Sequence, residues 1–143
     1  MSRPETFDLE ALLDIVADIY EKQIPFDRLL GMKVESLTME KAVVGFPMKP
    51  ELVGNYVIGS LHGGVISAVL DALGGMTAST GVVKRMAGRP AEEVANALTR
   101  MGTIDLRIDY LRPGKGTHFQ ATGTIMRTGK KVAVTRMELH NEK

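Results

Sequence analysis

The stretch from residue 63 to residue 80 constrains the fold most, because its apolar side chains recur with the period of an α-helix. It combines a wide apolar face with an opposite face of small residues that carries one carboxylate, Asp71. Such a small-residue strip lets another backbone or a thin ligand approach closely, although each internal glycine costs about 1 kcal/mol of helix stability. The apolar face holds Val65, Ile66, Val69, Leu70, Leu73 and Met76, and the small-residue face holds Ser67, Ala68, Asp71, Gly74 and Gly75.

Short segments with strand patterning lie on both sides of this helix. They span residues 32–38 and 41–48 before it, and residues 102–111, 119–125 and 131–139 after it. Apolar and polar side chains alternate in them, which is typical of a strand with one covered face. Gly-containing turns separate the later segments. We therefore predict an α+β fold in which an antiparallel sheet wraps around a long central helix.

Two further helices are expected. Residues 7–22 carry an amphipathic helical stripe that Pro25 ends, within an N-terminal helical extension over residues 1–30. A short helix opens after Pro90, with Glu92 and Glu93 placed against its positive end. This second helix is predicted to be an insertion between the long helix and the later strands.

Composition limits what the chain can do. Its 143 residues and 44% hydrophobic content fit one domain over residues 1–143. The formal charge of +1 gives no global field for nucleic acid, so we expect no nucleic-acid partner. Without cysteine there is no disulfide, thiolate nucleophile or sulfur-ligated zinc, and we predict no metal and no cofactor. No apolar run approaches about eighteen residues, so we expect no stable membrane insertion and a cytoplasmic protein.

The residues around the start of the long helix can carry chemistry. Gly63 and Gly64 open the helix, where unpaired backbone N–H groups stabilise a developing oxyanion. Asp71 lies about two turns further along, where a carboxylate can activate water or attack a carbonyl. Thr103 and Asn55 offer a hydroxyl and an amide to orient that water.

Each of these residues also has a structural explanation when it is considered singly. A helix-surface Asp such as Asp71 is usually solvated, and His62 before two glycines is more often a turn residue. Thr103 fits simple strand propensity, and Asn55 fits turn chemistry. Only their combination favours a catalytic site.

That combination resembles a known family. The spacing of Asn55, His62, Gly63, Gly64 and Asp71 is similar to the motif of hotdog-fold thioesterases of the PaaI-like group, in its YigI-like branch. The strand that begins at Thr103 and ends in Tyr-Leu-Arg-Pro also resembles that family's signature. The resemblance spans about residues 25–141, and it implies a hotdog fold, a curved antiparallel sheet around a central helix.

The resemblance implies hydrolysis of acyl-CoA thioesters in a site built from both protomers of a homodimer, with a dimer of dimers as the larger assembly. It makes Asp71 the general base or nucleophile and the Gly63 N–H the group that polarises the thioester carbonyl. Asn55 and Thr103 would position water from opposite subunits, and His62 would shape the site beside the sulfur. Gly64 would contact substrate. Nine methionines favour a medium or long acyl chain, although so many methionines more often indicate an adaptable core than a substrate tunnel.

The phosphates of CoA require cations at the mouth of the site. Basic residues gather near the predicted turns, where they are candidates for this role, although turns of soluble proteins are commonly rich in lysine. The candidates are Arg112, Lys115, Arg127, Lys130 and Lys131.

This sequence departs from the family pattern in three places. The spacing from Asn55 to His62 is one residue longer than expected for the family, which bears on the role of Asn55. Residues 82–100 form an insertion that would lid or reshape the acyl pocket. The family usually continues past residues 139–141 with a further strand, so we expect a missing C-terminal strand and an unpaired sheet edge here.

Three other functions are alternatives to thioester hydrolysis. A hotdog hydratase pairs its Asp with a His about five residues later, but Met76 stands there. A non-catalytic acyl-CoA-binding protein would use the same pocket, and as a DNA-linked sensor it would need a DNA-binding segment that the sequence lacks. A purely structural oligomerisation domain would not need a carboxylate on a glycine-lined face.

Overall fold

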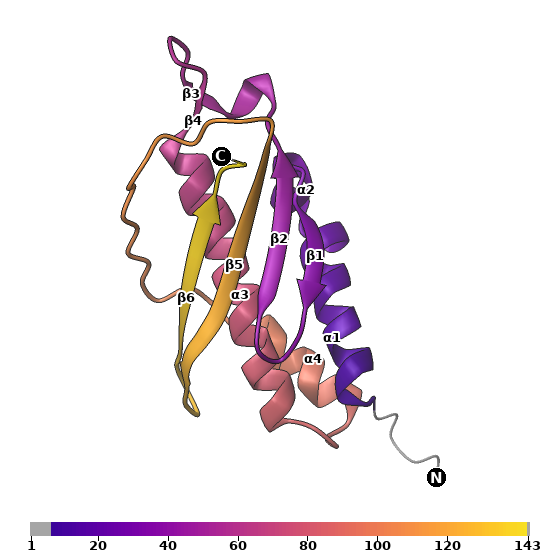
Figure 1. The fold of residues 1–143 in the computed structure, drawn as a ribbon. Helices are drawn as coiled ribbons and strands as arrows, with labels where there is room; N and C mark the ends of the chain where they lie inside the picture. The colour runs from indigo at the N-terminus through magenta and orange to yellow at the C-terminus, as the bar shows by residue number, and fades with distance from the viewer. Residues whose placement is uncertain (1–6, 143) are drawn as a thin grey trace.

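A computed structural model describes residues 7–142 and shows an α+β fold in which a sheet covers one long helix (Figure 1). The sheet has four antiparallel strands in the order β1, β2, β5, β6. The predicted fold class is confirmed. The strands are β1 (Lys33–Leu37), β2 (Ala42–Pro47), β5 (His118–Thr128) and β6 (Ala133–His140), and a separate two-stranded sheet pairs β3 (Val53–Asn55) with β4 (Ser60–Leu61) after the 3-10 turn η2 (Pro50–Leu52).

The long helix α3 (Gly63–Arg85) lies against this sheet and forms the centre of the core. Its predicted apolar face is confirmed, because Val69, Leu73 and Met76 are fully buried. Across the sheet, Phe46 of β2 and Phe119 of β5 pair in register and stack with their ring centroids 5.3 Å apart. Burial of these large side chains, at about 25 cal/mol per Å² of apolar surface, holds the helix on the sheet.

Among residues 7–142, α3 has the length and the apolar character of a membrane span, with a mean hydropathy of 1.4 over its most apolar window. Half of that window is buried against the rest of the chain. Core helices pass the same test, so this composition is weak evidence for a span.

The N-terminal helix was predicted correctly but does not simply stop at Pro25. It consists of α1 (Leu9–Asp18) and a π-helical turn, η1 (Ile19–Gln23), and Pro25 then occupies the first position of a second helix, α2 (Pro25–Leu30). Proline suits that position, because its missing N–H would be unpaired there anyway.

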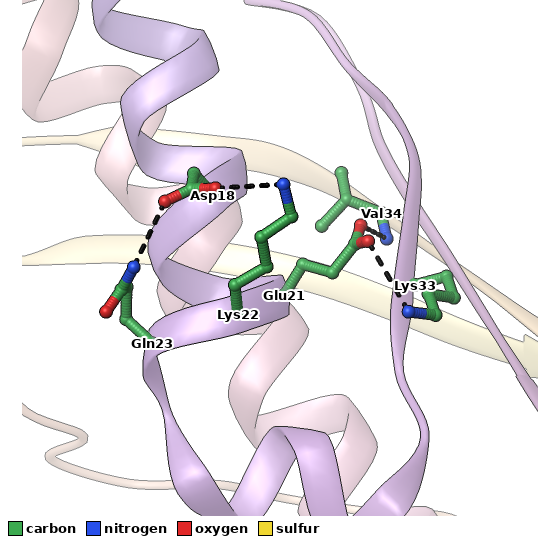
Figure 2. A network of polar contacts seen from close by, with 6 residues as sticks. All are labelled: Asp18, Glu21, Lys22, Gln23, Lys33 and Val34. Carbon is green, nitrogen blue, oxygen red and sulfur yellow. Dashed lines mark hydrogen bonds and ion pairs between the residues drawn. The ribbon is translucent and has the colours of Figure 1, made fainter.

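A network of polar contacts fastens η1 to the sheet (Figure 2). One carboxylate oxygen of Glu21 accepts the backbone N–H of Val34 at 2.8 Å, and the other lies 3.7 Å from the ammonium of Lys33. These contacts hold the N-terminal helices against β1, over the side of α3 that the sheet leaves open.

The inserted helix is confirmed as α4 (Ala91–Thr99). It packs beside the C-terminal half of α3 and buries Val94 there (Figure 1). That position is at the opposite end of α3 from the His-Gly-Gly turn.

Residues 102–111 do not form the predicted strand. They run as an extended segment without a strand partner among the described residues, and Ile104 is 78% exposed. Alternation of apolar and polar side chains indicates which face of a segment is covered. A strand also requires hydrogen bonds to a neighbouring backbone, which the pattern does not predict. Within residues 7–142, β6 is therefore an edge strand of a four-stranded sheet (Figure 1).

The small-residue face of α3 makes room for side chains rather than for a backbone or a ligand. A Cβ on Gly74 would lie 3.0 Å from the terminal methyl of Met137, and one on Gly75 would lie 2.8 Å from the hydroxyl of Tyr20. The two glycines thus allow β6 and η1 to pack closely on either side of α3.

Gly123 of β5 gives a test of how tightly the sheet lies on α3. Its missing side chain points at Thr77, whose hydroxyl would lie 2.3 Å from an added Cβ. We expect Gly123→Ala to lower the free energy of unfolding by about 1 to 3 kcal/mol through overpacking. Chemical denaturation measures this, with Gly102→Ala, which meets open space, as the control. Equal stability of the two variants would contradict the described packing.

Candidate active site

The start of α3 is a tight turn built around His62. His62 is the N-cap residue, and its Nδ1 accepts the backbone N–H of Gly64 at 2.8 Å. The turn runs so close to β3 that a Cβ on Gly54 would lie 2.5 Å from the Cα of His62. None of the hydrogen bonds among residues 7–142 uses the Gly63 N–H, which leaves this donor for a ligand.

Tyr110 closes one side of this turn. Its hydroxyl lies 3.2 Å from the Gly63 carbonyl oxygen and within hydrogen-bond distance of the hydroxyl of Ser67. Ser67 donates to the same carbonyl at 3.0 Å, so the single Tyr110 hydroxyl hydrogen serves either the carbonyl or Ser67. Neither hydroxyl was predicted to have a role. The signal that could have identified Ser67 is its spacing, because Gly63, Ser67 and Asp71 recur every fourth residue on one helix face.

Asp71 and Thr103, both candidate site residues, lie in direct contact within one chain. The Thr103 hydroxyl donates to Asp71 Oδ1 at 2.6 Å, and the Asp71 side chain is half-buried. The exposed segment 102–111 is thereby fastened to α3 at both ends, by Thr103 and by Tyr110. A carboxylate held by one hydroxyl, with its second oxygen remaining for water, suits general-base chemistry.

Within one chain, the two halves of the predicted machinery do not meet. Gly63 and Asp71 are eight positions apart on one helix, which corresponds to about 12 Å along its axis. A base and an oxyanion donor that act on one carbonyl must both lie about 3 Å from the reacting atoms. The structure therefore assembles Asp71 with Thr103, and His62 with Gly63 and Gly64, as two separate groups.

Asn55 lies outside both groups. It sits in the exposed β3–β4 hairpin, which projects beyond the N-terminal end of α3 (Figure 1). Its side-chain oxygen accepts the backbone N–H groups of Val57 and Ile58 at 3.1 and 3.4 Å. In this chain Asn55 therefore acts as a turn residue.

The candidate cations fall at opposite ends of the sheet. Arg112 and Lys115 lie in the loop before β5, which is tied to the His-Gly-Gly turn because Leu61 donates its backbone N–H to the Gly114 carbonyl at 2.9 Å. The others lie at the far end of β5, an eleven-residue strand that spans about 35 Å. There, a surface pocket of about 450 Å³ is lined by Arg127, Gly129, Lys130, Lys131, Val132 and Val134.

Asp27 is a carboxyl group that the sequence analysis did not single out. Its side chain, on the first turn of α2, is only 2% exposed, and its Oδ2 has no hydrogen-bond partner among the described residues. Burial raises the pKa of Asp27 to about 6, and the negative charge of Asp71 adds to this effect. Its position beside Phe26 and Leu29, which are exposed, hides the burial from a sequence pattern.

Tyr20 joins the two carboxyl groups into one cluster. Burial raises the pKa of the Tyr20 hydroxyl, a hydrogen bond with Ser79 opposes that rise, and the charges of Asp27 and Asp71 add to it. The side chains come from η1, α2 and α3, and α2 packs against both of the others. Within residues 7–142, no three His, Asp or Glu side chains gather as metal ligands would.

The fold and this helix-borne site define a thioesterase of the hotdog class. The family model for the Thioesterase superfamily matches residues 58–143, and the chain belongs to that superfamily. It is similar to the medium/long-chain acyl-CoA thioesterase YigI of Escherichia coli K12, with 44% identity over 133 residues, which are 93% of this chain and 86% of that relative.

Solved structures agree with this assignment. A Shewanella oneidensis protein described as related to the thioesterase superfamily superposes with a TM-score of 0.89 at 44% identity, covering 94% of this chain and 88% of the other. A mutant of the phenylacetic acid degradation protein PaaI from Thermus thermophilus superposes with a TM-score of 0.58 at 25% identity, covering 83% and 88%.

The buried Asp27 gives a prediction for stability against pH. Because its folded pKa is raised above 3.8, Asp27 stabilises most below about pH 3.8, and this contribution is lost as the pH rises to about 6. We expect Asp27→Asn to gain up to about 3 kcal/mol relative to the wild type between pH 4 and pH 7. Denaturant unfolding across this range measures the difference.

The exposed Asp14→Asn is the control, with an expected change below about 0.5 kcal/mol. A constant offset between Asp27→Asn and the wild type from pH 4 to pH 7 would show that Asp27 ionises normally in the folded chain.

Proposed function

We propose that this chain hydrolyses acyl-CoA thioesters, with a preference for medium or long acyl chains. The observation that carries the proposal is the Asp71–Thr103 pair, with 2.6 Å between the hydroxyl and the carboxylate, on a helix that opens with His-Gly-Gly. The chain-length preference is supported by the printed activity of the Escherichia coli relative, at 44% identity.

The chemistry follows from the groups present. Asp71 takes a proton from water as that water attacks the thioester carbonyl, or attacks the carbonyl itself to form an anhydride that water then opens. The Gly63 N–H donates to the developing oxyanion, and Thr103 keeps Asp71 and the water oriented. The C–S bond breaks, and the CoA thiolate leaves and takes up a proton. The products are a fatty acid and CoA.

His62 and Gly64 shape the place where the sulfur leaves. The Gly64 N–H is already engaged by the imidazole of His62, so Gly64 contributes close backbone approach rather than a second donor. This arrangement supports Gly63 as the oxyanion contact in the proposed reaction, with the remainder of the imidazole packed beside the thioester.

We infer that the active unit is a homodimer in which Asp71 of one protomer faces Gly63 of its partner. This arrangement resolves the separation of about 12 Å between the two residues in one chain. It also gives the extended segment 102–111 a neighbouring backbone, and it covers Ile104 and Leu111, which are 78% and 87% exposed. Asn55 would reach a reacting water only from the partner's hairpin.

The CoA phosphates need a local cluster of cations. Arg112 and Lys115 are the first candidates, because their loop is hydrogen-bonded to the residue before His62. Arg127 and Lys130 line the pocket at the other end of the sheet and are the second candidates. In a dimer of dimers, further copies of both cation pairs could reach the CoA phosphates.

Release of CoA thiol tests the function. We expect the wild type to hydrolyse medium- and long-chain acyl-CoA esters faster than short-chain or aryl esters, and Asp71→Asn to lower kcat by a factor of about 10² or more. Asp109→Asn, an exposed carboxylate on segment 102–111, is the control and should retain activity. Both variants should melt like the wild type.

Full activity in a folded Asp71→Asn variant would contradict the proposed chemistry. Binding of acyl-CoA without turnover by the wild type would instead support a non-catalytic acyl-CoA-binding protein.

A further inference from the structure

The buried carboxyl of Asp27 has no part in the reaction as described so far. Fully buried polar groups are normally hydrogen-bonded, so an unpartnered carboxylate oxygen in the interior calls for a functional explanation. Replacing such a group with an apolar one would remove a cost to folding. Asp27 lies on α2, which packs against α3, the helix that carries Asp71.

Asp27 lies on α2, which packs against both η1 and α3. Tyr20 of η1 lies over Gly75 of α3, where the absence of a side chain leaves room for its hydroxyl. Ser79, one turn further along α3, donates to the Gly75 carbonyl at 2.8 Å. Tyr20 is half-buried and Asp27 is buried; burial raises the pKa of both groups, and the charge of Asp71 raises it further.

The ionisable groups that affect Asp27, or are affected by it, lie on the elements packed against α2. On α3, in addition to burial, the negative charge of Asp71 raises the pKa of Asp27. On η1, again in addition to burial, the charge of Asp27 raises the pKa of the Tyr20 hydroxyl. Lys49 meets the other end of α2, where its ammonium donates to the Leu29 carbonyl at 2.7 Å. No cation among the described residues has a resolved effect on Asp27.

We propose that Asp27 is a positioning residue for the thioesterase reaction, a buried charge behind α3 that makes proton abstraction or nucleophilic attack by Asp71 more favourable. The inference rests on the proposed function of Asp71. Two like charges repel most strongly where water is scarce, and the repulsion acts on both groups. Asp71 loses its negative charge when it takes up a proton or forms a bond to the acyl carbon, and the repulsion then disappears. Negative charge on Asp27 therefore favours this step.

The pH dependence of the reaction tests this proposal. Asp27 ionises at about pH 6, so kcat for an acyl-CoA ester should rise in a step near that pH. Asp27→Asn should remove the step and lower the plateau of kcat by about fivefold to tenfold, with KM unchanged. Asp27→Glu should restore the step. A step near pH 6 that persists in Asp27→Asn, or an effect of this variant on KM alone, would overturn the proposal.

A second readout needs no substrate and separates failure of this proposal from failure of the proposed function. Carboxyl carbon NMR of Asp27 follows its ionisation in the wild type and in Asp71→Asn. We expect the midpoint, at about pH 6 in the wild type, to fall when the charge of Asp71 is removed. The same midpoint in both proteins would overturn the coupling even if thioesters are hydrolysed, and a lower midpoint would support it even if they are not.

Discussion

The contact between the apolar face of α3 and the sheet determines where every site residue lies. Val69, Leu73 and Met76 are fully buried in it, so the helix cannot rotate without exposing them. With that face fixed, the small-residue face must point towards η1, β6 and segment 102–111. Asp71 therefore lies between an exposed side, where Thr103 donates to it, and an interior side, where Asp27 is buried and Tyr20 is half-buried.

The sequence alone was sufficient for the elements that carry a strong periodic pattern. The helical period of residues 63–80 and the alternation in β2 and β5 predicted the central layer and its buried face. The choice of Asp71 and Thr103 as candidate site residues rested on resemblance to a family, and their direct contact was not predicted, because residues 32 positions apart have no local signal of contact. Asp27 was missed because exposed apolar neighbours surround it in sequence, and its burial depends on how α2 packs.

Segment 102–111 shows the limit of pattern-based prediction most clearly. Its alternation is that of a strand, yet a strand also requires a partner backbone, which one chain does not provide among its described residues. The candidate catalytic groups are also divided within one chain, since Gly63 and Asp71 lie about two helical turns apart. The proposed homodimer would account for both features, because a second copy of the chain would give the segment a partner backbone and would bring the two catalytic groups together.

Complementation between two inactive variants tests this shared site most directly. Gly63→Pro removes the oxyanion N–H, and proline suits the first helical position and the extended His62 tolerates it. Gly63→Ala is the control, because it keeps the N–H but adds the same Cβ, 3.3 Å from the ring of Tyr110. Asp71→Asn and Gly63→Pro should each be inactive alone. Randomly mixed dimers should recover about a quarter of wild-type activity, since half are heterodimers with one intact site. Heterodimers that form but show no recovered activity would contradict a site shared between protomers.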